Sequence, residues 1–369
     1  MRKFSFSSTE DLSVFLKNEK NKKILIICGE KSYKTSGAEK LISNLLANQN
    51  TQYFYKKFSY PDLPELKQII SFIKKFSPEM IISVGGGSVL DYAKIANVLT
   101  DSSDLENEIV NSSYKTNKKF AKLIAIPTTA GSGAEVTSNA VIYINKKKYS
   151  VEGPYLRPDF FFLIPELVIG ASNKIKSSSG FDAIAQAMES LISKKSNEKS
   201  LEFAKKSLTI SLKYYLDFLK KPNLENTAAM CLAANLSGEA ISISKTTAPH
   251  AVSYPFTSIY NISHGHAVSL TINKFLRFNF ENLEIAKSEF NLKKRYQIMF
   301  DLSKSDNINS FDKYLTNLKK EANLENNYSK LGINIKNDYS KIISGVNILR
   351  LANNPVELKE EDLKKIIQS

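Results

Sequence analysis

The sequence predicts a chain of two domains, an α/β domain built on a mainly parallel sheet and, after it, an all-helical domain. Its 369 residues are enough for two hydrophobic cores of ordinary size. As far as about residue 170, short β-branched apolar runs alternate with helix-like stretches, which is the order that βα units produce. Beyond about residue 175, long amphipathic segments replace the strand signals. We therefore expect the first domain at residues 1–175 and the second at 176–369.

The apolar runs of the first domain define its expected strands and helices. Strands are expected at residues 23–28, 79–87, 122–130 and 139–144, and helices at 38–48 and 63–75. Residues 160–169 add a last extended stretch, which Pro165 interrupts. Nearly continuous apolar strands are typical of a parallel sheet that helices cover on both faces.

The second domain is expected to contain only helices. Its amphipathic segments lie at residues 179–194, 199–218 and 224–242, and Lys-rich segments follow beyond residue 280. A polar stretch at residues 171–179, rich in Ser, Asn and Lys, is the expected boundary between the domains.

The formal net charge of the chain is +14, which raises the question of an anionic partner. The lysines are spread along the whole sequence, and no interleaving of basic and aromatic residues accompanies them. Nucleic acid is therefore not expected as a partner. We instead expect a locally positive entrance to the active site, which would attract a small anionic substrate.

The cysteines and the hydropathy pattern indicate a cellular compartment. Cys28 and Cys231 are too few for a disulfide framework or a Cys-based zinc site. The N-terminal segment is too polar for a signal peptide, and no apolar run reaches the ~20 residues of a membrane helix. We expect a cytoplasmic protein that does not bind a membrane.

A glycine-rich segment follows the second expected strand. Residues 81–94 read IISVGGGSVLDYAK, with three glycines and Ser88 between a buried strand and a helix. Glycines let a backbone approach a pyrophosphate, and the start of the next helix offers N–H groups at the positive end of its dipole. A tight turn capped by Ser88 is the structural alternative. Asp91, one turn into the helix, either holds the loop or complements the helix dipole.

A second polar run, PTTAGSGAEVTSNAV at residues 127–141, also follows a strand. Its hydroxyl-bearing and small residues are suited to lining a nucleotide site. Clusters of this kind are also common in ordinary loops, and that alternative stays open.

All three histidines of the chain, His250, His264 and His266, lie within 17 residues of one another. Two histidines from neighbouring helix starts and one carboxylate make a three-ligand metal site with an open position. The carboxylate candidate is Asp182 in SSSGFDAIAQAMES, with Gln186 one turn later on the same helix face. A dipole partner for Asp182 and ordinary core histidines are the alternatives.

Four segments together resemble a known family. GGGSVLDYAK, PTTAGSGAEVTSNAV, GFDAIAQAMES and HAVSYPFTSIYNISHGHAV come in the order, and near the spacings, of the iron-containing (group III) alcohol dehydrogenases, over roughly residues 20–280. The resemblance implies a dehydroquinate synthase-like fold. Such a fold has an N-terminal nucleotide-binding domain, a C-terminal helical domain, and the active site in the cleft between them.

The resemblance also implies roles for individual residues. The positions that match the family's cofactor site are Gly86, Gly87 and Ser88 for the pyrophosphate, Thr128 and Thr129 for the adenosine half, and Asn139 and Lys148 toward the ribose and nicotinamide. Asp182, His250 and His264 fall on three of the four metal-ligand positions.

The chain departs from the family pattern at three places. Gln186 stands where the fourth ligand is usually a His, so a three-ligand site for Fe²⁺ or Zn²⁺ is expected, and ligation by Gln186 stays open. Tyr254 replaces a family His that is not a ligand, and we expect it to relay protons together with His266. Gly29, beside Glu30, stands where many members carry an Asp for the adenine ribose, so NADP is expected as well as NAD.

The activity that the resemblance implies is hydride transfer between NAD(P) and a small alcohol or aldehyde, with a divalent metal as Lewis acid. The segment from Ser244 to Val268 is similar to the subgroup of phosphonoacetaldehyde reductases and 3-deoxy-D-manno-octulosonate 8-oxidising enzymes, which implies an anionic substrate. Lys245, Lys274 and Arg277 flank the histidines and are candidates to meet its charge.

Two other functions stay open on the same fold. One is a cyclase or lyase of the dehydroquinate synthase type, in which bound NAD is recycled. The other is a paralogue that only binds nucleotide. The oligomeric state is open too, although the resemblance makes a homodimer the form to expect.

Overall fold

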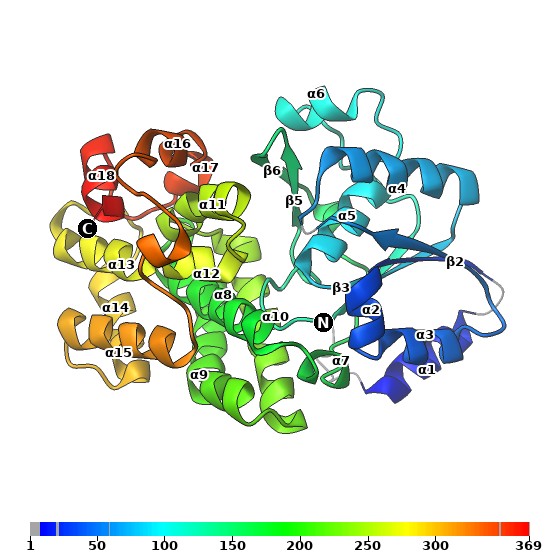
Figure 1. The fold of residues 1–369 in the computed structure, drawn as a ribbon, viewed down its shortest axis with the longest axis horizontal. Helices are drawn as coiled ribbons and strands as arrows, with labels where there is room; N and C mark the ends of the chain where they lie inside the picture. The colour runs from blue at the N-terminus through cyan, green and yellow to red at the C-terminus, as the bar shows by residue number, and fades with distance from the viewer. Residues whose placement is uncertain (1–7, 20–21, 59, 347, 369) are drawn as a thin grey trace. The chain divides into compact units, whose positions relative to one another are not determined.

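The computed structural model describes residues 8–19, 22–58, 60–346 and 348–368, and the chain divides into two compact units (Figure 1). Unit 1 contains Met1–Ser172 and Asn223–Cys231, and unit 2 contains Asn173–Pro222 and Leu232–Ser369. Helix α10 (Leu224–Ser244) therefore contributes to both units. Within the described ranges, no helix combines the length and the apolar character that crossing a membrane requires.

Unit 1 is built on a five-stranded sheet in the order β2-β1-β3-β4-β7, in which every neighbouring pair is parallel. The strands are β1 (Lys23–Gly29), β2 (Asn50–Lys56), β3 (Met80–Gly85), β4 (Lys122–Pro127) and β7 (Phe160–Phe161). A separate antiparallel hairpin pairs β5 (Asn139–Ile144) with β6 (Lys147–Glu152). The prediction of a mainly parallel sheet is confirmed.

Alternate residues of each strand fill two cores, one on each face of the sheet. Leu25, Ile27 and Ile81 pack with α4 (Leu63–Phe76), α5 (Gly87–Val98), α6 (Leu105–Val110) and the β5–β6 hairpin. Ile24, Ile26 and Ile82 pack on the opposite face with α1 (Thr9–Asn18), α2 (Glu30–Thr35), α3 (Ala38–Leu45) and α7 (Glu166–Ile169). Apolar residues therefore occupy both faces of β1 and β3, and these strands read as continuous apolar runs.

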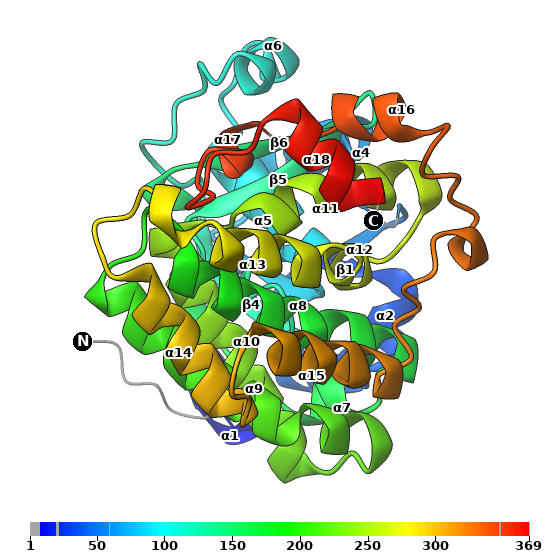
Figure 2. The same cartoon turned by 90° about the vertical axis from the view of Figure 1, so that its left-hand side faces the viewer.

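Unit 2 is helical, as predicted, and its centre is α8 (Asn173–Ile192), a helix buried on nearly all sides. Helices α9, α12 and α14 pack against it (Figure 2). The other helices are α9 (Glu198–Lys220), α11 (Ala248–Tyr260), α12 (His264–Ser269), α13 (Ile272–Glu281), α14 (Leu292–Ser303), α15 (Ile308–Glu321), α16 (Tyr339–Ser344), α17 (Ile348–Leu351) and α18 (Glu360–Gln368). Among the described residues, short 3₁₀ turns lie at Pro154–Leu156 in unit 1 and at Leu283–Ile285 and Ser329–Leu331 in unit 2.

The structure differs from the expectation at several elements, and α1, α2, α6 and β6 were not foreseen. Strand β2 was not foreseen because it lies at the sheet edge and its sequence, NTQYFYK, is only partly apolar. Residues 160–169 form only a two-residue strand before α7, because the backbone of Pro165, with φ −58° and ψ −32°, already has helical angles. The polar stretch at 171–179 is mostly the first turns of α8, where Ser177 is buried and its carbonyl accepts a hydrogen bond from Tyr215.

Candidate metal and cofactor sites

Three helices of unit 2 bring Asp182, His250 and His264 together. Asp182 lies in the middle of α8, His250 in the first turn of α11, and His264 at the first residue of α12. One potential ligand atom from each lies within 4.8 Å of the others. Because Asp182 is far from either end of its helix, a role as an early partner of the helix dipole does not apply.

The spacing of these atoms fits a transition metal. The Oδ1 atom of Asp182 is 3.2 Å from Nε2 of His250 and 3.9 Å from Nε2 of His264. Two ligands of a tetrahedral zinc ion are about 3.4 Å apart, given metal–ligand bonds of about 2.0–2.1 Å. The donor set of one carboxylate and two imidazoles is the one that such metals take in catalytic sites with an open position.

Gly265, between His264 and His266, allows α12 to approach α8. A Cβ atom at this position would lie 1.9 Å from the carbonyl oxygen of Ser178 and 2.9 Å from Cβ of Asp182. Any larger residue would force the start of α12, and with it the His264 ring, away from Asp182.

Glu189 is a functional candidate that the sequence analysis missed. Its carboxylate is fully buried, and Oε2 meets Nδ1 of His250, while Oε1 accepts from the Thr247 amide at 2.9 Å, the Thr247 hydroxyl at 3.0 Å and the His250 amide at 3.3 Å. A carboxylate only accepts hydrogen bonds, so Nδ1 carries a proton, and Nε2, on the Asp182 side, is the nitrogen that would bind a metal when the ring is neutral. Glu189 thus has the role of the outer carboxylate in carboxylate–histidine–metal sites. The missed signal was its position on the same helix as Asp182, seven residues later.

The two carboxylates also set the charge state of His250 in the absence of a metal. Burial lowers the pKa of the imidazole, but the neighbouring Glu189 and Asp182 outweigh burial and raise it to about 9. The site is therefore built for a cation, which a proton supplies when no metal is bound.

Gln186 contacts the second oxygen of Asp182. Its Nε2 donates to Oδ2 of Asp182 at 3.0 Å, and its Oε1 accepts from the Ser237 hydroxyl at 3.0 Å. In this arrangement the amide oxygen faces Ser237, and the amide nitrogen fixes the Asp182 carboxylate.

Tyr254 lies next to the three candidate ligands. Its ring stacks on that of His264, with 5.8 Å between centroids and 25° between planes. Burial raises the pKa of its hydroxyl to about 12, and the Arg350 guanidinium within hydrogen-bonding reach opposes that shift. Tyr254 is therefore protonated at neutral pH, with a fixed positive charge beside it. Arg350, on α17, is a second residue that the sequence analysis did not single out.

His266 points elsewhere. Its Nε2 contacts the carbonyl oxygen of Glu325 at 2.8 Å, and burial lowers its pKa. It lines a small cavity of about 350 Å³ together with Ser263 and Ala322. The structure thus brings Tyr254, and not His266, to the candidate metal ligands.

In unit 1 the glycine segment forms the turn from β3 into α5. Gly86 is the N-cap of α5, with Gly87 as the first helical residue, so the expected cap at Ser88 is wrong, whereas the tight turn between strand and helix is present. A Cβ at Gly87 would lie 2.7 Å from Oγ of Ser132, and one at Gly85 would lie 2.6 Å from the Val89 side chain. The glycines are therefore needed for close packing of the turn against Ser132 and Val89.

The polar run at 127–141 packs directly against this turn. The amide of Thr128 donates to the carbonyl oxygen of Gly85 at 3.0 Å, and Thr129 lies 3.4 Å from the Cβ position of Gly86. The run is thus more than a surface loop, because Thr128 is buried and the run is held beside the glycine turn.

A buried lysine, not foreseen from the sequence, organises the far end of that run. The Nζ atom of Lys94 on α5 donates to the carbonyl of Ala134 at 3.0 Å, to the Thr137 hydroxyl at 2.8 Å and to the carbonyl of Asn139. Asp91, one turn earlier, accepts from the Val141 amide at 3.0 Å, which anchors the hairpin to α5.

The remaining two cofactor candidates lie on that hairpin. Asn139 begins β5, and Lys148 on β6 pairs with Tyr143. The structure therefore gathers the predicted cofactor residues around α5, with Asp91 acting on the hairpin instead of the glycine turn.

Sequence profiles of one family match nearly the whole chain. The profile of iron-containing alcohol dehydrogenases matches residues 3–165, and that of the C-terminal region of Fe-containing alcohol dehydrogenases matches residues 176–369. Among curated proteins, the phosphonoacetaldehyde reductase of Streptomyces viridochromogenes is 30% identical over 217 residues, 56% of this chain and 55% of that protein. The match thus spans about half the length of that relative. The 1-propanol dehydrogenase of Citrobacter freundii is 28% identical over 313 residues, 84% of this chain and 81% of the relative.

Solved structures share the fold. The sulfoacetaldehyde reductase of Bifidobacterium kashiwanohense, determined with NAD⁺, has a TM-score of 0.86 at 24% identity, covering 98% of this chain and 94% of that one. An archaeal alcohol dehydrogenase from a Red Sea brine pool has a TM-score of 0.88 at 20% identity, covering 100% and 99%. The predicted fold class is confirmed by these likenesses, and the resemblance by the profiles that cover both units: the chain is an oxidoreductase that belongs to the iron-containing alcohol dehydrogenase family.

Proposed function

We propose that this protein is a metal-dependent, NAD(P)-linked alcohol dehydrogenase or aldehyde reductase that acts on a small anionic substrate. The observation that carries the proposal is the group of Asp182, His250 and His264 in unit 2, with Glu189 holding the His250 ring. A protein that retained only nucleotide binding would not need three buried or half-buried ligands and an outer carboxylate in one place.

The three residues would hold Fe²⁺ or Zn²⁺, which supplies a Lewis acid for the substrate oxygen when bound. The chain itself fixes the geometry around that position. Glu189 keeps the His250 proton on Nδ1, and Gln186 occupies one oxygen of Asp182, so the other oxygen faces both histidines. This fixed orientation means that little reorganisation is needed during turnover.

Tyr254 is the proposed proton carrier at this site. Its hydroxyl is protonated at neutral pH because burial raises its pKa to about 12. During reduction of an aldehyde the oxygen of the substrate gains a proton, and the Tyr254 hydroxyl beside the His264 ring is placed to donate it. His266, turned to the Glu325 carbonyl, is not part of this proposed path.

Arg350 is the proposed recognition group for the substrate's anionic end. Its guanidinium lies at the Tyr254 hydroxyl, and a guanidinium suits phosphonate, sulfonate and carboxylate oxygens. Arg277, a sequence candidate for this role, is instead paired with Asp312 at 3.3 Å and with Glu281 at 3.4 Å. Relatives named for reducing phosphonoacetaldehyde and sulfoacetaldehyde support an anionic substrate.

Use of both NAD and NADP is part of the proposal. Strand β1 ends at Gly29, where a carboxylate would repel a 2′-phosphate, and Glu30 is exposed and lies 3.8 Å from the Lys34 ammonium. The protein's preference is measured by comparing kcat/KM for NADH and NADPH with one aldehyde.

The test uses the full chain loaded with Fe²⁺ or Zn²⁺ and assays NADH oxidation with phosphonoacetaldehyde, sulfoacetaldehyde, succinic semialdehyde and propanal. We expect turnover of at least one anionic aldehyde, and loss of that turnover in Asp182→Ala. Arg350→Met should raise KM for the anionic aldehyde at least tenfold and change KM for propanal little.

Arg277→Met removes the same charge at a residue already engaged in ion pairs, and it should leave both KM values unchanged. Lack of turnover with every aldehyde, or activity unaffected in Asp182→Ala, would overturn the proposed reaction. Equal effects of Arg350→Met on charged and uncharged aldehydes would overturn the assigned substrate class.

A further inference from the structure

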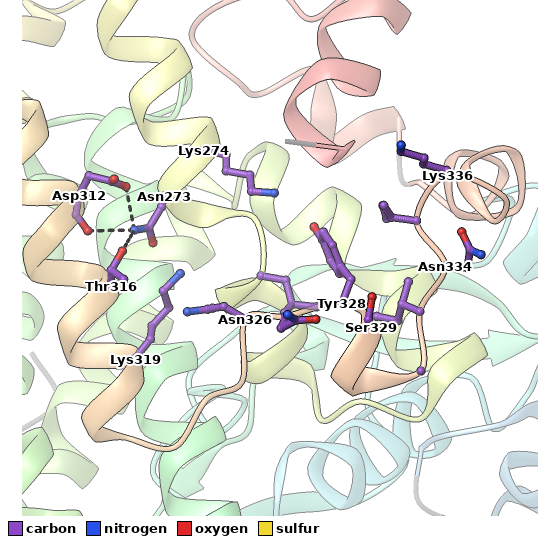
Figure 3. Close-up of a pocket in the computed structure, with 15 residues that line it drawn as sticks. Asn273, Lys274, Asp312, Thr316, Lys319, Asn326, Tyr328, Ser329, Asn334 and Lys336 are labelled. Carbon is purple, nitrogen blue, oxygen red and sulfur yellow. Dashed lines mark hydrogen bonds between the residues drawn. The ribbon is translucent and has the colours of Figure 1, made fainter.

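Unit 2 contains a second, larger cavity whose lining includes none of the three candidate metal ligands. It has a volume of about 880 Å³ and lies between α13, α15 and residues 326–336 (Figure 3). Pockets for small molecules typically have volumes of ~300–1,000 Å³. The size is therefore that of a metabolite site.

Two lysines from separate helices reach into this cavity. Lys319 on α15 is only 4% exposed, and its Nζ donates to the Ser269 carbonyl at 3.0 Å. Lys274 on α13 lies over the Tyr328 ring, with its Nζ 5.1 Å from the centroid. Figure 3 shows both side chains extending toward the same space. Both lysines therefore line one space, and a buried ammonium group such as that of Lys319 favours an anionic ligand.

Two other charged side chains belong to the lining. They are Lys336, a third cation, and Asp312, whose carboxylate is paired with Arg277 at 3.3 Å. Burial lowers the pKa of Lys319 to about 8; Asp312 opposes this shift and the charge of Lys274 adds to it. Burial also lowers the pKa of Lys274. Three lysines and one aspartate therefore line the cavity.

Two buried polar atoms in the same lining lack a hydrogen-bond partner among the described residues: the Tyr328 hydroxyl and Oδ1 of Asn273. The Asn273 amide nitrogen donates to Asp312 and Thr316, which turns its oxygen the other way, as Figure 3 shows. Asn273 is only 9% exposed. An unpaired buried polar group is unfavourable, so a ligand that pairs with these atoms stabilises the unit.

We infer that this cavity binds a small phosphate monoester that also carries hydroxyl groups, such as a sugar phosphate. A phosphate monoester carries a charge of about −1.5 to −2 and has three strong acceptor oxygens. These match the Lys274 and Lys319 ammonium groups and the donating Tyr328 hydroxyl. The Asn273 oxygen, an acceptor, takes the proton of a hydroxyl that the ligand carries beyond its phosphate group.

The test is isothermal titration calorimetry of the full chain with ribose 5-phosphate, glycerol 3-phosphate, inorganic phosphate and ribose. NADH is kept at saturation so that the glycine turn of unit 1 does not compete for phosphate. We expect the phosphate esters to bind, inorganic phosphate to bind more weakly, and ribose not to bind. Lys274→Met and Tyr328→Phe should each weaken ester binding, tenfold or more for the lysine and several-fold for the tyrosine.

The matched control is Lys320→Met, which removes the same charge from an exposed neighbour on α15 that does not line the cavity. It should leave binding unchanged. Lys319→Met should abolish binding, and if that variant fails to fold, Lys274→Met and Tyr328→Phe decide the matter. Absence of ester binding at millimolar concentration, or binding unaltered in both of these variants, overturns the inference. Inorganic phosphate binding as tightly as the esters overturns the assigned role of Asn273.

Discussion

Replacing Glu189 by Gln tests whether the buried carboxylate behind His250 prepares the metal site. The substitution keeps the shape of the side chain and removes one acceptor atom and the charge. In the structure both carboxylate oxygens are in use, one at Nδ1 of His250 and the other at three donors from Thr247 and the His250 amide. A carboxamide cannot serve both sides, because it has one acceptor and one donor group.

Each orientation of the new amide therefore has a cost. If its nitrogen faces His250, the ring proton must move from Nδ1 to Nε2, the atom that faces Asp182, and Nε2 then no longer binds a metal. If its nitrogen faces Thr247, the new NH2 group lies opposite the Thr247 and His250 amides, which are also donors, and these amides lose their acceptor. Loss of such outer partners typically weakens metal affinity about 10–100-fold, which is about 1.4–2.7 kcal/mol.

The assay is competition for Zn²⁺ between metal-stripped protein and a chromophoric chelator, with circular dichroism to confirm the fold. Asp182→Ala sets the scale, since it removes a direct ligand. Glu65→Gln is the matched control, because Glu65 is equally buried but belongs to unit 1. A Zn²⁺ affinity within twofold of the parent in Glu189→Gln, with affinity lost in Asp182→Ala, would refute the orienting role.

Three further predictions follow from single contacts. Gly265→Ala should lower the free energy of unfolding in urea by about 1–3 kcal/mol and weaken Zn²⁺ binding, because the new Cβ would meet the Ser178 carbonyl oxygen. If neither the free energy of unfolding nor the Zn²⁺ affinity changes, the close approach of α12 to α8 is contradicted. Lys94→Met should weaken NADH binding in fluorescence titrations and lower the free energy of unfolding by about 1–3 kcal/mol, because three acceptor atoms in residues 134–139 lose their donor. If both the NADH affinity and the free energy of unfolding stay unchanged, the polar run at 127–141 does not depend on Lys94. Burial lowers the folded-state pKa of Lys319 from its ordinary value of 10.5 to about 8. Between these two pH values the unfolded chain binds more protons than the folded chain, so the free energy of unfolding should rise with pH there, by about 1.4 kcal/mol per pH unit at most. Comparing unfolding at pH 7.5 and 9.5 with Lys319→Met isolates this slope, and a slope that persists in the variant would assign it to other groups.

The fold and the candidate ligands were predictable because they depend on local patterns. The apolar runs of β1, β3 and β4 predict a buried parallel sheet. The clustered histidines indicate a possible metal site, and the resemblance of the surrounding segments to a known family selects Asp182, His250 and His264 as its candidate ligands. Strand β2 was not predictable in this way, because an edge strand needs to bury only part of its surface and keeps polar residues. The α8 start was missed for the opposite reason, since serines that signal a loop are buried there by contacts with distant segments such as Ala322 and Tyr215.

The supporting residues could not be read from the sequence, because their roles depend on tertiary contacts. In the sequence Glu189 is an ordinary helix glutamate, and only the packing of α11 shows its contact with His250. Lys94 likewise has the sequence pattern of a surface lysine, and only the folded run at 127–141 shows that it is buried and hydrogen-bonded. Arg350 lies nearly 100 residues beyond Tyr254 in the chain and comes beside it only through the packing of α17 on α11. Candidate metal ligands can be recognised in a sequence by their residue type and spacing, whereas the residues that orient them can be recognised only from their position in the folded structure.

Gln186 shows how a departure from a family pattern becomes intelligible only with such contacts. Read alone, a Gln in place of a His weakens the case for a metal. In the structure its amide bridges Asp182 and Ser237, both buried, because its nitrogen donates to the carboxylate and its oxygen accepts from the hydroxyl. The replacement therefore exchanges one potential ligand for a fixed carboxylate. A site with three protein ligands and a rigid Asp182 is consistent with catalysis, because the open position that a substrate oxygen needs is retained.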